Sequence, residues 1–322
     1  MSKSRSDTHA KYRSLLQKAV RHGQVDLVLT TSALLSSLGP QEKNWFRTRT
    51  AIITFEESWP LGSQLVFNKK FHSKVAALVK VSLSQKARDA TGLGYLAYAL
   101  SEGDASVLNG TNQDRALKII ANAARRPIDF WSWIESQPQS EQQTPLIEKA
   151  RYFRNEGSPR DKTVIQSAAY LALTNEIPNP EELPPPNEAF PYWIAFDRHT
   201  AEGSTALRDI ARDLHISLPQ LEWSCYYFEG ALANAALPSK WWDRYCDWRF
   251  RKIGLVAAEA HLLWEPAKKQ VIEALADDSR KLQKDLYRWR LANREQIVAL
   301  KRQVELFNIH FEEVQRDQSD LF

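Results

Sequence analysis

Apolar residues recur three and four positions apart along most of this chain, which is the spacing of one face of an α-helix. In the first such segment Tyr12, Leu15, Leu16 and Val20 share a face, and Gly23 ends it. The same spacing predicts further helices in the first half over residues 26–38, 42–57, 67–83, 84–100, 112–125, 145–153 and 162–173, with a short aromatic turn or helix over 130–134.

Two stretches of this first half have features beyond the helical spacing. Residues 51–55, Ala-Ile-Ile-Thr-Phe, could form a strand, but we favour a helix because the apolar spacing continues through them and the neighbouring segments are helical. Gly92 and Gly94 indicate that another part of the chain approaches this segment closely.

Residues 176–187, EIPNPEELPPPN, interrupt the helical pattern with five prolines. Such a stretch cannot form a helix or a central strand, so it predicts an extended connector. Beyond it, Ser204 is expected to cap a helix over 206–214, and apolar residues predict helical segments over 219–233 and 240–263. Glu265 and Pro266 are expected to restart the chain.

Residues 268–316 contain neither Gly nor Pro and predict a long C-terminal helix. Six apolar residues three and four apart predict a coiled-coil or antiparallel-helix seam: Ile297, Leu300, Val304, Phe307, Phe311 and Val314. The sequence therefore predicts an all-α, multi-helical fold in two helical parts: a domain over residues 1–175, a linker over 176–187, and an aromatic-rich domain over 188–322.

Composition agrees with a helical globular protein and limits its setting. The chain has 322 residues, 43% hydrophobic and 25% charged, with 11 Gly against 15 Pro. Two cysteines are too few for a disulfide scaffold, and no apolar run reaches the length of a membrane span. The first residues are polar, so they are not expected to form a signal peptide. We therefore expect a cytoplasmic protein that does not interact with membranes.

The common catalytic motifs are missing from the sequence. It contains no Walker phosphate loop, no GxGxxG, no CxxC and no HExxH, which excludes P-loop ATPases, the usual dinucleotide enzymes and common zinc sites. None of the seven histidines is four residues from another. We therefore predict no metal and no cofactor, and the sequence favours a non-enzymatic protein.

Two charged groups remain open to a functional or a structural interpretation. Arg47, Arg49, Glu56 and Glu57 could form a surface for a partner chain, or could be ordinary charges on a helix. In the loop before residue 201, His199 could act as a general base oriented by Asp197. The alternative is that the polar side chains of this loop only satisfy its own backbone.

The third group is a basic segment over residues 280–302, whose eight cations and two acids give a net charge of +6. Tyr287 and Trp289 lie among the cations, and cations with interleaved aromatics can follow phosphates and stack on bases. We therefore list as candidate nucleic-acid contacts Lys284, Tyr287, Arg288, Trp289, Arg290, Arg294 and Lys301. A solvated helix face with one aromatic packed inward is the alternative.

Residues 11–175 resemble the helical C-terminal, collar-like region of clamp-loader-like AAA+ ATPases of the Werner-helicase-interacting and replication-associated recombination family. Three stretches carry the resemblance: KAVRHG from Lys18, RTRTAIITFEES from Arg47 and LGYLAYAL from Leu93. The sequence lacks that family's ATPase domain, so nucleotide hydrolysis is not implied. The resemblance implies a helical domain that oligomerises or binds a replication partner, in which the Arg47–Ser58 stretch is a structural motif.

These observations lead to three hypotheses of different classes. The first is a non-enzymatic adaptor in DNA replication, repair or mobile-element biology that binds nucleic acid, DNA in preference to RNA, or replication proteins, with possible self-association. The second is a structural interaction protein that assembles through the 297–314 seam. The third is an enzyme centred on Asp197 and His199.

Overall fold

The computed structural model describes residues 9–67, 70–108 and 114–319, with side chains as far as residue 309. Within them the fold is all-α: no strand is present, and extended segments pair only at isolated bridges. The helices of the first half are α1 (Ala10–Arg21), α2 (Val25–Ser37), α3 (Pro40–Glu57), α4 (Phe71–Ser82), α5 (Asp89–Ser101), α6 (Asp114–Arg125), α7 (Pro127–Ser136), α8 (Gln143–Phe153) and α9 (Pro159–Thr174). The second half contributes α10 (Ala201–Asp213), α11 (Leu218–Cys225), α12 (Lys240–Lys252), α13 (Ala257–Ala274), α14 (Ala276–Ala292) and α15 (Arg294–Ser319).

The ambiguous segment in the first half is helical, as predicted. Pro40 opens α3 after Gly39, whose positive φ of 121° few other residues adopt readily, and the helix continues without a break to Glu57. Phe46, Ile52, Ile53 and Phe55 are buried along it. The run that could have formed a strand is therefore apolar because α3 is surrounded by other helices.

Three sequence-based boundaries were wrong. The cap of α10 is Thr200, whose hydroxyl accepts from the Gly203 amide, so the helix begins before Ser204. Pro266 lies inside α13 and does not restart the chain, because buried Trp264 and Ala267 hold the helix on both sides of it. The stretch 268–316 is divided into three helices, because Leu275 and Asn293 leave helical geometry. The last of them, α15, is 26 residues long.

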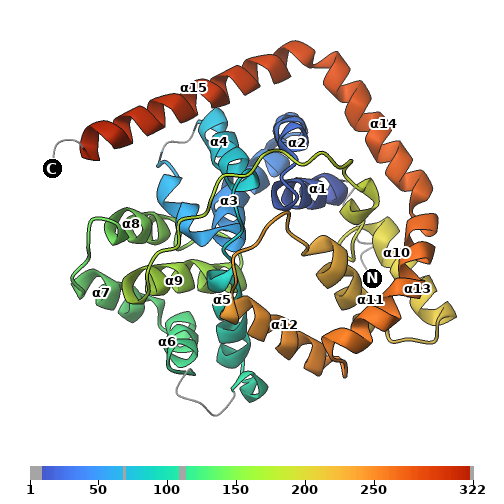
Figure 1. Cartoon of the computed structure of the whole chain (residues 1–322), viewed down its shortest axis with the longest axis horizontal. Helices are drawn as coiled ribbons and strands as arrows, with labels where there is room; N and C mark the ends of the chain where they lie inside the picture. The colour runs from blue at the N-terminus through green and yellow to red at the C-terminus, as the bar shows by residue number, and fades with distance from the viewer. Residues whose placement is uncertain (1–8, 68–69, 109–113, 320–322) are drawn as a thin grey trace.

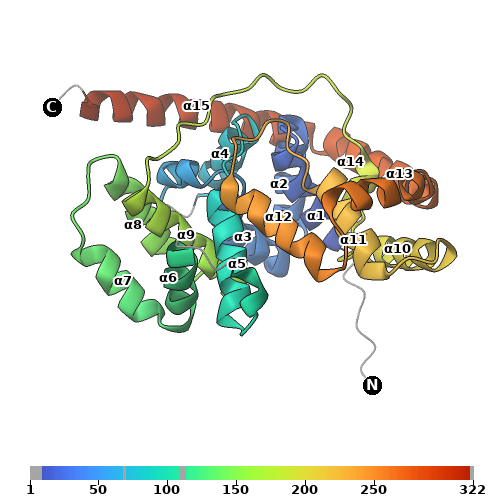
Figure 2. The ribbon, with the colours of Figure 1, turned by 60° about the horizontal axis from the view of Figure 1, so that its bottom comes forward.

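The three C-terminal helices follow one another around the outside of the molecule (Figures 1 and 2). α13 and α14 lie along the side of the second half, and α15 then crosses over α4 and α2 of the first half. Ile297, Leu300 and Val304 are buried there against residues of α1 to α4. The first half of the predicted seam therefore packs within this chain; Phe311 and Val314 lie outside the residues whose side chains are described.

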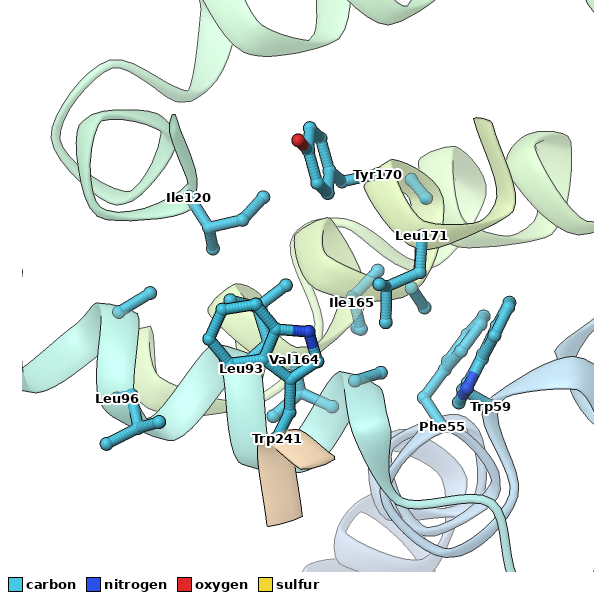
Figure 3. Packing of buried hydrophobic residues seen from close by; sticks show 14 of the residues in the cluster. Phe55, Trp59, Leu93, Leu96, Ile120, Val164, Ile165, Tyr170, Leu171 and Trp241 are labelled. Atoms are coloured by element: carbon cyan, nitrogen blue, oxygen red, sulfur yellow. The ribbon is translucent and has the colours of Figure 1, made fainter. Parts of the chain in front are cut away.

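Each of the three hydrophobic cores contains residues from both sides of the proline-rich connector. The largest joins α5 and α9 to α12, and Leu93, Val164 and Trp241 lie close together in it (Figure 3). A second joins α1 to α4 with α15, and a third joins Leu15 and Leu34 to residues 190–286. The two parts of the sequence thus complete each other's cores.

The connector runs extended between these parts. Leu183 donates its amide to the Leu83 carbonyl, Gln85 donates to the Glu181 carbonyl, and Glu182 pairs with Lys80 at 3.0 Å. Its backbone is therefore partly satisfied by the short extended segment that follows α4. No described helix has both the length and the apolar character to cross a membrane.

Gly92 and Gly94 mark the closest helix contacts, as their presence predicted. A Cβ at Gly92 would lie 2.2 Å from the backbone carbon of Trp241 at the start of α12. A Cβ at Gly94 would lie 2.8 Å from the backbone of Val164 in α9. Real Cβ atoms do not approach backbone so closely, so α5 can pack against α9 and α12 only because both positions lack a side chain.

Candidate nucleic-acid interface

The double acid at the end of α3 lies inside the molecule. Glu57 is 2% exposed and accepts from two guanidinium groups, Arg21 of α1 at 2.5 Å and Arg88 before α5 at 2.8 Å. Both arginines also donate to backbone carbonyls of the second half, Arg21 to Gly230 and Arg88 to Ala231. One carboxylate therefore connects the two parts of the chain through two buried cations.

Glu56 forms the adjacent half of the same arrangement. Its carboxylate accepts from Arg49 at 3.1 Å and from the Tyr95 hydroxyl at 2.7 Å, and Arg49 also pairs with Asp161 of α9 at 2.9 Å. We call Arg21, Arg49, Glu56, Glu57, Arg88 and Asp161 the buried ion-pair network. Arg49 and Glu56 are seven residues, about two turns, apart on α3, and the long arginine side chain spans that distance.

The pKa values of Glu56 and Glu57 are shifted in opposite directions. Burial alone would raise the pKa of Glu57, but Arg21 and Arg88 outweigh it and lower the pKa to about 2. For Glu56, burial raises the pKa, and the charge of Asp161 adds to this while Arg49 opposes it. Three of the candidates for a partner surface, Arg49, Glu56 and Glu57, instead form ion pairs inside the fold. Arg47 remains exposed, 3.8 Å from Glu156.

His22, beside this network, makes stability depend on pH. Burial, and then the charge of Arg21, lower the pKa of His22 to about 4. Because the unfolded state binds a proton near pH 6.5 and the folded state does not, stability should fall as the pH drops from 6.5 to 4. We expect a loss of about 1–2 kcal/mol from this half-buried ring, measured by urea unfolding across that range.

His22→Phe should keep the edge contact with Phe190, whose ring centroid is 5.7 Å away, and remove the titration. Its stability at pH 7 should match the original chain, while its loss of stability toward pH 4 should be smaller. An unchanged slope in this variant would contradict the assignment.

Asp197 and His199 make the contact expected of a general base and its orienting group, because Nδ1 of His199 lies 3.2 Å from Oδ1 of Asp197. Asp197 accepts from Lys18 of α1 at 2.5 Å and from the Ser14 hydroxyl at 3.1 Å. Burial favours its neutral form, but Lys18 holds the pKa of Asp197 well below its ordinary value. His199 donates its backbone amide to this carboxylate at 2.9 Å, and its ring is 69% exposed. Thus Asp197 fastens the loop to α1, and His199 lies at the surface.

The basic segment lies on the outer surface of α14 and α15. The buried side of α14 consists of Leu282 and Leu286, and Tyr287 on the other side is 62% exposed. All eight cations of the segment are exposed: Arg280, Lys281, Lys284, Arg288, Arg290, Arg294, Lys301 and Arg302. We call Lys284, Tyr287, Arg288, Arg294, Lys301 and Arg302 the outer basic face.

Not every candidate in this segment is available to a ligand. Arg290 pairs with Asp26 of α2 at 3.2 Å, and Arg280 pairs with Asp277 at 2.5 Å. Trp289 is half-buried against two of the cores, so it packs inward while Tyr287 points outward. In the part of the chain that the structure describes, the five cations of the outer basic face form no ion pair. The structure therefore separates the candidates into those with a partner in this chain and cations without an ion pair among the described residues.

A basic cavity lies close to this face and was not foreseen. Its volume is about 590 Å³, and it lies where α2 ends and α3, α4 and α15 begin. Three cations line it, Lys43 and Arg47 of α3 and Lys74 of α4, together with Gln296 in the first turn of α15. Because these residues come from three helices far apart in the sequence, no local spacing could have indicated the cavity.

Comparison with known proteins identified no relative of this chain. No protein-family model, no curated protein and no solved structure matches the chain. Among the described residues, no group of three or more His, Cys, Asp or Glu side chains is arranged to hold a metal ion. The functional interpretation therefore depends on the geometry and charge of the surface itself.

Proposed function

We propose that this chain is a non-enzymatic adaptor in DNA replication, repair or mobile-element biology that binds nucleic acid through the outer basic face. The observation that supports the proposal is the set of five exposed cations on α14 and α15 without an acidic partner in the described structure. Exposed cations in ion pairs are already neutralised, whereas free ones can replace the counterions of a phosphate backbone.

Two further features agree with this proposal. Tyr287 lies exposed between Lys284 and Arg288 on the same helix, where it could stack on a base while the cations contact adjacent phosphates. The buried ion-pair network and the interior position of Ile297, Leu300 and Val304 account for the other charged and apolar motifs within the fold. Most cations of the basic segment, by contrast, make no ion pair within the described part of the chain.

The test is the affinity for single- and double-stranded DNA and RNA, measured by fluorescence anisotropy at two salt concentrations. Replacing Lys284, Arg288 and Arg294 together by Ala should lower the affinity roughly tenfold to a hundredfold at low salt. The dependence of log affinity on log salt should also become shallower, by about 0.9 for each lost contact with duplex phosphate.

A matched control removes the same charge from another surface. Arg115, Lys118 and Arg126, around α6, are also exposed, and their replacement by Ala should leave the affinity nearly unchanged. Equal losses in the two triple variants would mean that net charge, and not the outer basic face, determines binding. Absence of binding to every nucleic acid at low salt would contradict the proposal itself.

A further inference from the structure

The basic cavity lies beside the start of α15, the helix that also carries Arg294 of the outer basic face. Gln296, which lines the cavity, follows Arg294 of the face by two residues. Three of the four helices around the cavity contribute their N-terminal turns, with Lys43 and Lys74 each three residues after the first residue of its helix. Amides and helix dipoles at N-termini favour anions, and here they add to the charge of the side chains.

The charged residues that line the cavity are all positive. Lys43, Arg47 and Lys74 line it, and no acidic residue does. The nearest acid known to contact these cations is Glu156, 3.8 Å from Arg47. Burial, and then the charge of Arg47, lower the pKa of Lys74, and the charge of Glu156 opposes them only in part. An anion in the cavity would relieve that repulsion.

The remaining wall indicates what is attached to the anion. The rings of Phe46 and Phe71 lie 5.2 Å apart and form an apolar side of the cavity. The hydroxyls of Ser36 and Ser37 donate to carbonyls of their own helix, so they offer acceptors to a ligand and the cations are the donors. A volume of about 590 Å³ lies within the range of small-molecule sites and can hold one nucleotide.

We infer that this cavity binds the terminal phosphate of a nucleic-acid strand, with the end nucleotide against Phe46 and Phe71. The inference rests on the proposed function, because the strand would reach the cavity from the outer basic face. A terminal phosphate carries nearly two negative charges at neutral pH, against one for an internal phosphate.

The experiment compares internally labelled DNA strands of one sequence that carry a 5′ phosphate, a 3′ phosphate or hydroxyls at both ends. One of the two phosphorylated strands should bind roughly tenfold more tightly than the hydroxyl strand. Lys74→Met, and separately Lys43→Met, should remove this preference while keeping the affinity for the hydroxyl strand. Lys80→Met, on the same helix α4 but outside the cavity lining, should retain the preference.

The outcomes separate the two proposals. Lys284→Ala should weaken the binding of all three strands in parallel and leave their ratio unchanged. Equal affinity of the phosphorylated and hydroxyl strands for the original chain would overturn the cavity assignment and leave the outer basic face intact. No binding of any strand would overturn both. An excess of nucleoside monophosphate should reduce the phosphorylated strand to the affinity of the hydroxyl strand; complete displacement of both would show a site for free nucleotide instead.

Discussion

Glu57→Gln is expected to destabilise the fold by about 3–5 kcal/mol, the cost of removing one partner from a buried ion pair. The amide keeps the size of the side chain but not its charge, so Arg21 and Arg88 would remain buried beside a neutral group. Both guanidinium groups also hold carbonyls of Gly230 and Ala231, so the contact between the two parts of the chain should weaken as well. Equilibrium unfolding in urea measures the loss.

An exposed pair provides the control for this substitution. Glu135 pairs with Arg151 at 2.7 Å, but both side chains are more than 40% exposed, so Glu135→Gln should change stability by less than about 1 kcal/mol. A similarly small loss for Glu57→Gln would show that the interior tolerates the two arginines without their carboxylate. In that case the network would not be what holds α1, α3 and the second half together.

The helical class and most helix positions could be predicted because they depend on local spacing. The run at 51–55 illustrates this: its apolar residues continue the period of α3, and the structure keeps them in one helix from Pro40 to Glu57. The errors occurred where contacts distant in the sequence override a local signal. Pro266 usually interrupts a helix, yet α13 continues through it because Trp264 and Ala267 are buried on either side.

The same distinction applies to the candidate site. The outer basic face was predictable, because Lys284 and Arg288 are one turn apart on a single helix. Sequence spacing could not show that Arg290 binds Asp26, 264 residues earlier, or that Glu57 lies between two arginines from other elements. Whether a charge is a surface contact or an interior one depends on which helices pack together, and that is decided by the whole chain.

Gly92→Ala is expected to destabilise the fold by about 3 kcal/mol, although alanine favours a helix by about 1 kcal/mol over glycine. The added Cβ would lie 2.2 Å from the backbone carbon and 2.3 Å from the carbonyl oxygen of Trp241. Backbone cannot rotate aside as a side chain can, so α5 and α12 would have to separate, loosening a core that contains residues of both parts of the chain.

Thermal and urea unfolding of this variant should be compared with Ala99→Gly, two turns further along α5 at a half-buried position. That reverse change should cost only about 1 kcal/mol, the difference in helix propensity. If close packing against Trp241 outweighs helix propensity, Gly92→Ala should lower the free energy of unfolding more than Ala99→Gly does. A neutral or stabilising Gly92→Ala would mean that propensity dominates and that α12 can move away from α5 without loss.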